Sequence, residues 1–411
     1  MSFLPPHRDD RHLSVLHVSA DFPDAYEASK TPAVRNLIEL VGDRFCHSVI
    51  SLNRVSPGWA ESLGMLTGRQ SAILGCRPSS GLYSMRYAGF PKGILHASML
   101  HRLADALSDR VATGPLPDLL VGYKLTAEGL VVAEMARRLG VPYALLLQGN
   151  SDVRALAARP DLRRLFAATL RDAAVVFSLA PWATARVEAM LGVKAKAVVD
   201  LPCPVTLDTP VPPRITGGGL VTAFHLRHHR LKNFAGLVRA VKSARRHDGK
   251  LELAVIGGGS ARQAAQVERI AGRAPGIMLA GALPNSAMPA AYNGSAGFVL
   301  PSLRESFGMV FIEALFCGAP VVYPAGRAIS GCFEDEPFAI AVDPLDPEAI
   351  AEGMLRLRRD EASLKADLAR WQTSGAADRY TRDEIARSFE HGLRSAVIPS
   401  NERAAVRVAA A

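Results

Sequence analysis

Short apolar runs and amphipathic helical patterns alternate along the first two hundred residues of the chain. Apolar runs rich in β-branched residues are typical of buried strands, and apolar residues three or four positions apart are typical of one helix face. The expected helices are 31–42, 92–111 and 129–140. The expected strands are 13–19, 47–53, 117–123, 141–150, 173–180 and 195–202. This alternation predicts a parallel sheet covered on both faces.

A proline- and glycine-rich segment separates this half from a second one. Residues 202–219 hold five prolines and three glycines, which is the composition of a linker. The alternation then resumes at 220–226, 234–246, 251–259, 276–283, 297–302, 307–318 and 320–324. We therefore expect a first domain over 1–202, a linker over 203–219, a second domain over 220–385, and a C-terminal helix and tail over 386–411 that packs on the first domain. Two doubly wound domains leave a cleft between them, lined by the carboxyl ends of both sheets.

The composition suits two globular domains in the cytoplasm. The 411 residues are 49% apolar and 21% charged, so each half can bury a core. No apolar run reaches the ~20 residues that cross a bilayer, and the first residues lack the apolar stretch of a signal peptide. The five cysteines are scattered and form no C-x-x-C pair, which is typical of reduced thiols rather than disulfides or a zinc site.

The charge favours an anionic partner. The net charge is +9 and the isoelectric point is about 9.5. Nucleic acid, membrane phospholipid and a phosphorylated small molecule all fit this balance, and a solvated basic surface with no such partner competes with them.

Two carboxylates interrupt residues 301–322, PSLRESFGMVFIEALFCGAPVV. The preceding run predicts a strand, so Glu305 is expected just past its carboxyl end, in the cleft. Ser306 is a candidate N-cap for the helix that follows. Phe307–Met309 would then present free backbone N–H groups to an anion or a sugar oxygen.

Glu313 is expected beside the apolar face of that helix. Met309, Ile312 and Leu315 would face the core. A carboxylate at such an edge is costly unless it has a partner, and a vicinal diol of a sugar offers two hydroxyl donors. The alternative is a solvated Glu313 and a Glu305 that only caps the helix, and the two glutamates by themselves favour that alternative.

Two cations follow the first strand of the second half. In residues 223–241, AFHLRHHRLKNFAGLVRAV, Arg227 and Lys232 lie between a strand and a helix. Such a loop can neutralise a diphosphate, which arginine binds through two parallel hydrogen bonds. The alternative is a basic surface loop. The three histidines of the segment have no ordered carboxylate partners, so we interpret them as loop residues rather than metal ligands.

A glycine run at 255–263, VIGGGSARQ, only partly matches a dinucleotide-binding motif. A G-x-G-x-x-G motif that begins at Gly257 needs a glycine where Arg262 stands, and one that begins at Gly258 fails at Ser260. We expect these glycines to form a tight turn after a strand and to line the cleft.

The order of these motifs over residues 220–350 resembles the C-terminal domain of the retaining glycosyltransferases of family 4. The likeness is carried by FHLRHHRLKN, LAVIGGGSA and LAGALPNSAMPAAYNGSAGFVLPSLRESFGMVFIEALFCGAPVV, the last of which contains the Glu-x7-Glu signature of that family. The N-terminal half is similar more loosely, in VLHVSADFP and GLVVAEMARRLGVPYALLLQGNSD. The resemblance implies the α/β fold called GT-B, with two Rossmann-like domains and a cleft between them.

The same resemblance implies how a nucleoside-diphosphate sugar would be held as co-substrate. Arg227 and Lys232 would bind the donor diphosphate, and Glu305 would contact the transferred sugar. The remaining donor contacts would come from Glu313 at the ribose diol, the backbone of Phe307, Gly308 and Met309 at the sugar, Gly257 and Gly258 at the sugar or phosphate, and Gly281 and Leu283 at the nucleobase. Such enzymes are thought to stabilise the departing diphosphate without a protein nucleophile. No metal and no other cofactor is expected.

The N-terminal half departs from the family pattern at two places. The usual Gly-Gly turn after the first strand is replaced by a loop in which Asp24, Ser29 or Lys30 could supply a side-chain contact. The usual histidine on a later strand is replaced by Gln148, with Asp152 nearby. Glutamine can hydrogen-bond a sugar hydroxyl but takes no proton at neutral pH. The resemblance implies that the domain over 1–202 binds the acceptor and that the domain over 220–385 binds the nucleotide sugar. We expect Gln148, Asp152 and Lys30 on the acceptor or sugar side.

These observations favour a retaining transferase that moves a hexose from a GDP- or UDP-sugar to a saccharide or lipid-linked saccharide, in surface polysaccharide or glycolipid biosynthesis. The alternatives are a nucleotide-sugar epimerase or phosphorylase of the same fold, or a non-catalytic binder of nucleotide sugars or nucleic acid. Aromatic residues, at 6%, are few for base stacking, so no nucleic-acid partner is expected. Residues 86–103 combine cations with Tyr87, Phe90 and an amphipathic helix that could rest on an anionic membrane at the inner face of the plasma membrane. A helix packed on its own domain core is the favoured alternative.

Overall fold

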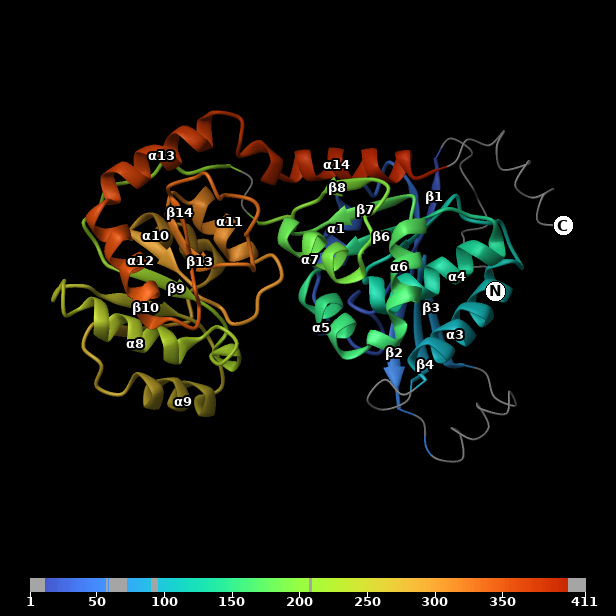
Figure 1. The fold of residues 1–411 in the computed structure, drawn as a ribbon, viewed down its shortest axis with the longest axis horizontal. Coiled ribbons are helices and arrows are strands. Elements are labelled where there is room, and N and C mark those ends of the chain that lie inside the picture. The colour runs from blue at the N-terminus through green and yellow to red at the C-terminus, as the bar shows by residue number, and fades with distance from the viewer. Residues whose placement is uncertain (1–11, 57, 59–71, 90–94, 207–208, 398–411) are drawn as a thin grey trace. The chain divides into compact units, whose positions relative to one another are not determined.

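A computed structural model describes residues 12–56, 58, 72–89, 95–206 and 209–397 of the chain. They divide into two compact units, of which unit 1 is Met1–Leu179, Ala183–Leu201 and Ile385–Ala411, and unit 2 is Ala180–Trp182 and Pro202–Glu384. In Figure 1 the blue-to-green elements and the red helix α14 belong to unit 1, and the yellow and orange elements belong to unit 2.

Unit 1 is built on an eight-stranded sheet in the order β3-β4-β2-β1-β5-β6-β7-β8. All neighbours pair in parallel except β3 and β4. The strands are β1 (Ser14–Ser19), β2 (Cys46–Val55), β3 (Ile73–Ser79), β4 (Leu82–Ala88), β5 (Leu119–Gly122), β6 (Tyr143–Leu147), β7 (Val175–Ser178) and β8 (Val198–Asp200). The central strands read as continuous apolar runs because helices cover both of their faces.

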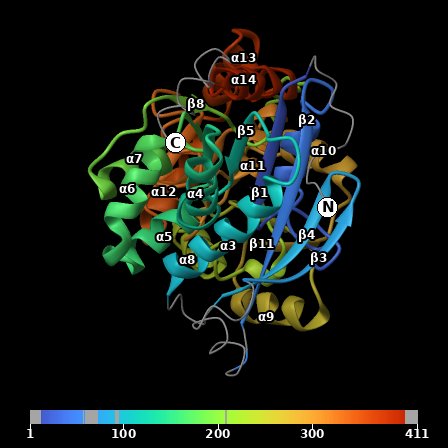
Figure 2. The ribbon, with the colours of Figure 1, turned by 90° about the vertical axis from the view of Figure 1, so that its right-hand side faces the viewer.

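The antiparallel hairpin β3–β4 was not expected from the sequence. Figure 2 shows it at the edge of the sheet beside β2. Most side chains of β3 are exposed, so this edge strand lacks the apolar run by which the buried strands are recognised. Arg86 and Tyr87, which the sequence grouped with a helix, lie on β4. Phe90 lies outside the described residues.

Two apolar layers fill unit 1. One face of the sheet packs on α3 (His96–Val111), α4 (Leu130–Leu139), α5 (Asn150–Ala158), α6 (Arg163–Asp172) and α7 (Pro181–Leu191). The other face packs on α1 (Ala33–Glu39) and α14 (Arg382–Ser395). Phe389 of α14 is buried against Phe177 of β7, with ring centroids 5.1 Å apart. The last described helix of the chain is therefore part of the core of unit 1.

The expected helix over 92–111 begins at His96. Leu95 adopts a left-handed backbone and is 43% exposed, so it does not continue the apolar face. Met99, Leu103 and Leu107 are buried in unit 1. This face therefore packs on the domain core, which was the favoured alternative to a membrane contact. No helix in the described ranges has the length and apolarity that crossing a bilayer requires.

Unit 2 is built on a six-stranded parallel sheet in the order β11-β10-β9-β12-β13-β14. Its strands are β9 (Leu220–Ala223), β10 (Leu253–Ile256), β11 (Ile277–Gly281), β12 (Gly297–Val299), β13 (Val321–Pro324) and β14 (Ala339–Val342). Its helices are α8 (Phe234–Ala244), α9 (Ala261–Ala271), α10 (Met288–Asn293), α11 (Met309–Phe316), α12 (Pro347–Arg359) and α13 (Glu361–Thr373). Helices α8 and α12 pack against each other, as Figure 1 also shows.

The segment that the sequence interpreted as a linker is held on unit 2 by two buried charges of α13. Glu361 accepts hydrogen bonds from the backbone N–H of Thr216 at 2.8 Å and of Gly217 at 2.9 Å. Lys365 donates to Glu361 at 2.8 Å and to the carbonyl oxygens of Ser295 and Arg214. This end of the linker is thus fixed to the unit that follows it.

Candidate active site

The site begins in the turn after β9. The chain leaves the strand through a helical turn, Leu226–His228, and enters α8 after Asn233, whose backbone is left-handed. Arg227 lies in that turn and Lys232 at the end of the loop. Nε of Arg227 donates to Nε2 of His228 at 2.9 Å. Burial and then the neighbouring cations lower the pKa of His228, so this imidazole accepts that bond in its neutral form.

Two glycine turns lie directly beside this loop. The backbone N–H of Leu226 donates to the carbonyl of Gly258 at 2.9 Å, and that of Gly257 donates to the carbonyl of Gly281 at 2.8 Å. A Cβ atom on Gly257 would collide with the carbonyl oxygen of Phe224, so only glycine lets the two strand ends approach this closely. The carboxyl ends of β9, β10 and β11 thus meet at one edge of the sheet.

The loop after β12 adds a carboxylate to the same edge. Nζ of Lys232 forms a charged hydrogen bond with Glu305, 73 positions further along the chain. Ser302 also donates to Glu305, at 3.4 Å. The side chains of Lys232 and Glu305 are 20% and 15% exposed, so this ion pair is largely shielded yet open to a ligand. The structure therefore brings together two of the three residues that the sequence singled out for catalysis, and Arg227 lies in the same loop as Lys232.

Helix α11 starts two residues later than expected. It begins at Met309 after Gly308, whose φ of 80° is left-handed, so Ser306 is not its N-cap. A Cβ on Gly308 would lie 2.7 Å from the ring of Phe311 and 3.0 Å from Cγ of Glu305, which requires glycine here and places this turn against Glu305. The Phe307 side chain is buried, so only its backbone could face a ligand.

Glu313 lies on the partly buried side of α11. Ile312 and Leu315 face the core as expected, whereas Met309 is 40% exposed and does not. Burial raises the pKa of the Glu313 carboxyl, and the hydroxyl of Thr206, which donates to it at 3.5 Å, opposes that shift only weakly. This carboxylate therefore has one long hydrogen bond among the described residues, and its remaining acceptor capacity is available to hydroxyl donors.

The remaining donor-side residues lie at the ends of β10 and β11. Gly258 and Gly281 belong to the turns described above, and a Cβ on Gly258 would lie 3.3 Å from Ala282. Leu283 is 36% exposed next to that turn. An apolar side chain at this edge can pack against a planar ring.

Three further candidates belong to unit 1. Lys30 pairs with buried Asp24 at 2.8 Å and also bonds Ser51 and the carbonyl of Leu52, which occupies all three of its N–H donors. Asp152 is fully buried. One of its carboxylate oxygens accepts hydrogen bonds from the backbone N–H and the hydroxyl of Thr126, so this side chain holds the turn that contains Thr126 in place.

Gln148 is the candidate of unit 1 with a free amide. It is half-buried and has no hydrogen-bond partner in the part of the chain that the structure describes. It is followed by Gly149, whose φ of 108° and ψ of −102° only glycine adopts readily, and α5 begins at the next residue.

The sequence missed a buried cluster at the end of β5. Lys124 pairs with Asp21 at 2.7 Å, and Glu128 accepts from the backbone N–H of Ala20 at 2.7 Å. Both groups lie around a π-helical turn, Leu125–Gly129, that directly follows β5. The second oxygen of Glu128 has no partner among the described residues, and burial raises the pKa of this carboxyl. The signal available was a lysine and a glutamate four residues apart directly after a strand.

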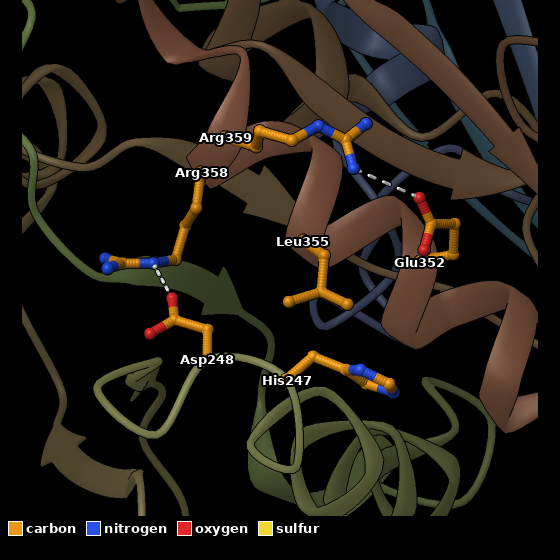
Figure 3. Close-up of a pocket in the computed structure, with 6 residues that line it drawn as sticks. All are labelled: His247, Asp248, Glu352, Leu355, Arg358 and Arg359. Atoms are coloured by element: carbon orange, nitrogen blue, oxygen red, sulfur yellow. Dashed lines mark hydrogen bonds and ion pairs between the residues drawn. The ribbon is translucent and has the colours of Figure 1, made fainter.

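A pocket of about 430 Å³ lies elsewhere in unit 2 (Figure 3). His247 and Asp248 contribute to it before β10, whereas the site residues follow their strands. Its arginines are already paired, Arg358 with Asp248 at 2.7 Å and Arg359 with Glu352 at 3.6 Å. This pocket is therefore separate from the charged edge that carries the candidate site. No cluster of three or more histidine, cysteine, aspartate or glutamate side chains in the described ranges is arranged to hold a metal ion.

Comparison with solved structures defines the class of fold. The chain is similar to sucrose-phosphate synthase from Thermosynechococcus elongatus, with a TM-score of 0.65 at 18% identity over 93% of this chain and 98% of that one. It is also similar to a UDP-forming trehalose-phosphate synthase from Burkholderia xenovorans, with a TM-score of 0.60 at 12% identity over 94% of this chain and 99% of that one. These likenesses confirm the predicted α/β fold of GT-B type.

Comparison of sequences then gives the family. Residues 219–360 match the family described as Glycosyl transferases group 1, which confirms the resemblance seen in the motifs. A D-inositol 3-phosphate glycosyltransferase of Salinispora tropica is 33% identical over 162 residues, which cover 37% of this chain and 33% of that protein. A sucrose synthase of Acidithiobacillus caldus is 28% identical over 181 residues, 39% of this chain and 23% of that protein. The chain thus spans a third or less of the length of these curated relatives.

Proposed function

We propose that the chain is a glycosyltransferase that takes a sugar from a nucleoside-diphosphate donor held at the charged edge of unit 2. The observation that carries this proposal is the ion pair between Lys232 and Glu305, which joins the loops after β9 and β12, with Arg227 in the first of these loops. All three residues lie inside the region that matches a glycosyltransferase family. Two cations and one carboxylate on adjacent loops suit a ligand with both a diphosphate and sugar hydroxyls.

In the proposed reaction the bond from the anomeric carbon to the diphosphate breaks, and a bond from that carbon to an acceptor hydroxyl forms. Negative charge develops on the departing diphosphate. Arg227 and Lys232 would stabilise this charge, and the backbone of their loop is held in place by its hydrogen bond to the turn after β10. The proton of the acceptor hydroxyl would pass to a phosphate oxygen of the leaving group. Retention of the anomeric configuration belongs to this proposal and is supported by the family resemblance.

Glu305 would exchange its bond to Lys232 for sugar hydroxyls when a donor binds. Lys232 is then released toward the phosphate, and the carboxylate accepts from the sugar. Glu313, in its less polar surroundings, would accept from the two ribose hydroxyls. Gly281 and Leu283 would border the base.

The remaining proposals concern the acceptor and the biological role. We propose a hexose as the transferred sugar, GDP or UDP as the carrier, and a saccharide or lipid-linked saccharide as the acceptor. Gln148 would contact the sugar through its free amide. The match to an O-antigen chain mannosyltransferase of Escherichia coli, 31% identical over 86 residues, supports a role in surface polysaccharide or glycolipid synthesis. A requirement for no metal, and contact with an anionic membrane, remain predictions.

A screen of donors tests the proposal. The wild type is incubated with UDP-, GDP- and ADP-sugars, and release of the nucleoside diphosphate is measured with and without saccharide acceptors. With the active donor, Lys232→Ala and Glu305→Ala are expected to lower kcat/KM by ~10²–10³, the usual cost of one electrostatic contact to a developing charge.

Matched controls are Lys242→Ala and Glu268→Ala, which remove exposed charges of the same kinds from α8 and α9. They should keep wild-type turnover. Failure of every common donor to be bound or consumed contradicts the proposed activity. Unchanged turnover in both site variants contradicts the placement of the site alone.

A further inference from the structure

Two arginines of unit 1 lie over one aromatic ring. The guanidinium carbon of Arg77 is 4.5 Å from the ring centroid of Tyr26, and that of Arg86 is 4.2 Å from it. Each cation is attracted by the ring face. A guanidinium that stacks on a ring still directs its N–H donors outward in its own plane, where they match the oxygens of an oxyanion. The ring therefore holds two donor forks in one place.

Both arginines lie on the same face of the sheet. Arg86 on β4 is opposite Asn53 on β2 and opposite Gly75 on β3. Arg77 is two residues beyond Gly75 and so shares its face. Asn53 is near the carboxyl end of β2, and this end of a parallel sheet is where open α/β sheets bind ligands.

The position of Tyr26 is fixed by a buried carboxylate. One oxygen of Asp24 accepts the backbone N–H groups of Tyr26 at 2.7 Å and Glu27 at 2.9 Å. Its other oxygen accepts from Lys30 at 2.8 Å and from Asn53 at 2.7 Å. Burial opposes the charge on Asp24, but these hydrogen bonds outweigh it and hold the pKa of the carboxyl well below its usual range. Asp24 and Lys30 therefore neutralise each other, and neither charge is available to pair with Arg77 or Arg86.

Room for the ring comes from a glycine. A Cβ on Gly75 would lie 3.1 Å from the hydroxyl of Tyr26, so any larger residue would push the ring away. The register of β3 against β4 also shifts between Ile73 and Gly75. The loop that carries Tyr26 is further tied to β4, because the backbone N–H of Ala25 donates to the hydroxyl of Ser84 at 3.1 Å.

Within the described ranges the two arginines lack a counter-charge. In the described part of the chain, Arg86 has no ion pair and no hydrogen bond. Arg77 makes one hydrogen bond, at 3.4 Å, to the carbonyl oxygen of Ala25. Both side chains are exposed. Two positive charges so close to one ring are unfavourable, and an oxyanion that accepts hydrogen bonds from both guanidinium groups would offset them.

We propose that Arg77 and Arg86, held on Tyr26, bind a phosphate group carried by the acceptor. That the phosphate belongs to the acceptor rests on the proposed function; the oxyanion site itself does not. A free sugar phosphate and the phosphate of a lipid headgroup present the same oxygens, so the test has an arm for each.

The first arm titrates glucose 6-phosphate and inorganic phosphate into the full chain by calorimetry, with glucose as the uncharged match. All proteins in this arm carry Arg227→Gln and Lys232→Gln, so that phosphate cannot bind at the proposed donor loop. Adding Arg77→Gln and Arg86→Gln is expected to weaken binding of the phosphate monoester at least tenfold. Arg54→Gln is the control. Arg54 is also an exposed arginine, next to Asn53 on β2 and therefore on the opposite face of the sheet.

The second arm measures sedimentation with vesicles of phosphatidylglycerol, using phosphatidylcholine as the neutral match. Binding that the double substitution abolishes, and that falls as salt rises, assigns the site to a lipid phosphate. Equal binding with and without the two arginines in both arms overturns the proposal. So does the absence of any binding by the protein that keeps them.

Folding and turnover give separate readouts. Circular dichroism should be unchanged in the double variant, because both side chains are exposed. If that variant does not fold, Arg86→Lys, which keeps the charge and loses the planar fork, should still weaken binding severalfold.

In protein with an intact donor loop, the double substitution should raise KM for a phosphorylated acceptor and leave donor hydrolysis unchanged. If no donor is consumed while phosphate still binds, the proposed function fails and the oxyanion site stands.

Discussion

Lys232 and Glu305 show how a single pair can define a site. Each is an unremarkable surface residue type, and an exposed pair of this kind would contribute little to stability. Here both are largely shielded, and they bring together the loops after β9 and β12. This placement beside the glycine turns, in the loop that also holds Arg227, is the reason why we propose a role for the pair in donor binding.

Glu313 gives a prediction on pH. Because burial raises the pKa of this carboxyl, it takes up a proton at a higher pH than an exposed glutamate does. The protonated form loses acceptor capacity for the ribose hydroxyls. Donor KM of the wild type should therefore rise as pH falls toward the acid range. Glu313→Gln should show a KM about tenfold higher at neutral pH, since about 1.4 kcal/mol corresponds to a factor of ten, and this KM should be flat on the acid side.

The pH profile is measured from steady-state rates at saturating acceptor. Glu268→Gln, a substitution of an exposed glutamate on α9, should keep the wild-type profile. An acid limb that persists in Glu313→Gln would mean that another group is responsible.

A hydrogen-bonded chain of polar side chains joins β1, β2 and the residue that follows β5. The hydroxyl of Tyr123 is 2.9 Å from Nδ1 of His17, and Nε2 of His17 is 2.8 Å from Nδ1 of His47. Nε2 of His47 lies 3.3 Å from the carbonyl of Val41. Since a carbonyl only accepts, His47 donates to Val41, His17 donates to His47, and Tyr123 donates to His17. Every ring nitrogen is thus used by neutral imidazoles.

The hydrogen-bonded chain of Tyr123, His17 and His47 should make the stability of unit 1 fall in acid. Burial, and then His47, lower the pKa of His17 well below the value near 6.5 that it has in the unfolded chain. Between those two values the unfolded state binds more protons. The contribution of His17 to the free energy of unfolding is therefore fully present above pH ~6.5 and is lost as pH falls below it. His17→Gln should weaken that dependence.

The measurement is the urea midpoint of unit 1 at pH 7.5 and pH 5.0. Replacing the exposed His101 by glutamine is the control, and it should leave the difference between the two midpoints unchanged. A His17→Gln protein whose midpoint falls with acid as steeply as that of the wild type would refute this account.

At the scale of the whole molecule, the linker belongs to unit 2. Glu361 and Lys365 are 5% and 2% exposed, and between them they bind the backbone of residues 214–217 and Ser295. Removing one partner of a buried ion pair leaves the other charge uncompensated and typically costs about 3–5 kcal/mol, whereas replacing both can be nearly neutral.

Lys365→Met should therefore release the linker and destabilise unit 2. We expect faster cleavage of residues 203–219 in limited proteolysis and an unfolding midpoint of unit 2 that falls markedly. The double variant Glu361→Gln/Lys365→Met should recover part of that loss. Linker cleavage at the wild-type rate in Lys365→Met would show that these two charges do not hold the segment.

The local pattern of the sequence was enough to predict the parallel sheets and to show the resemblance to a glycosyltransferase family. Buried parallel strands are continuous apolar runs, and helices carry a periodic stripe, so β1, β5 and α4 were visible without coordinates. The loop positions of Arg227, Lys232 and Glu305 followed from their places directly after strands. The exposed hairpin β3–β4 was missed, because its outer strand alternates too weakly and buries little.

What only the tertiary structure decided are the contacts between residues far apart in sequence. It placed α11 after Gly308 rather than at Ser306, because a left-handed glycine and not a side-chain cap starts that helix. Lys30 and Asp152 form hydrogen bonds inside unit 1, with Asp24 and Thr126. Tyr26, Arg77 and Arg86 come together from a loop and two strands. Burial and pairing depend on which surfaces meet, and no local pattern encodes that. The sequence determined most of the elements and the resemblance to a glycosyltransferase family, because both depend on local pattern. The packing of the strands decided which charged side chains are paired inside the protein and which are not.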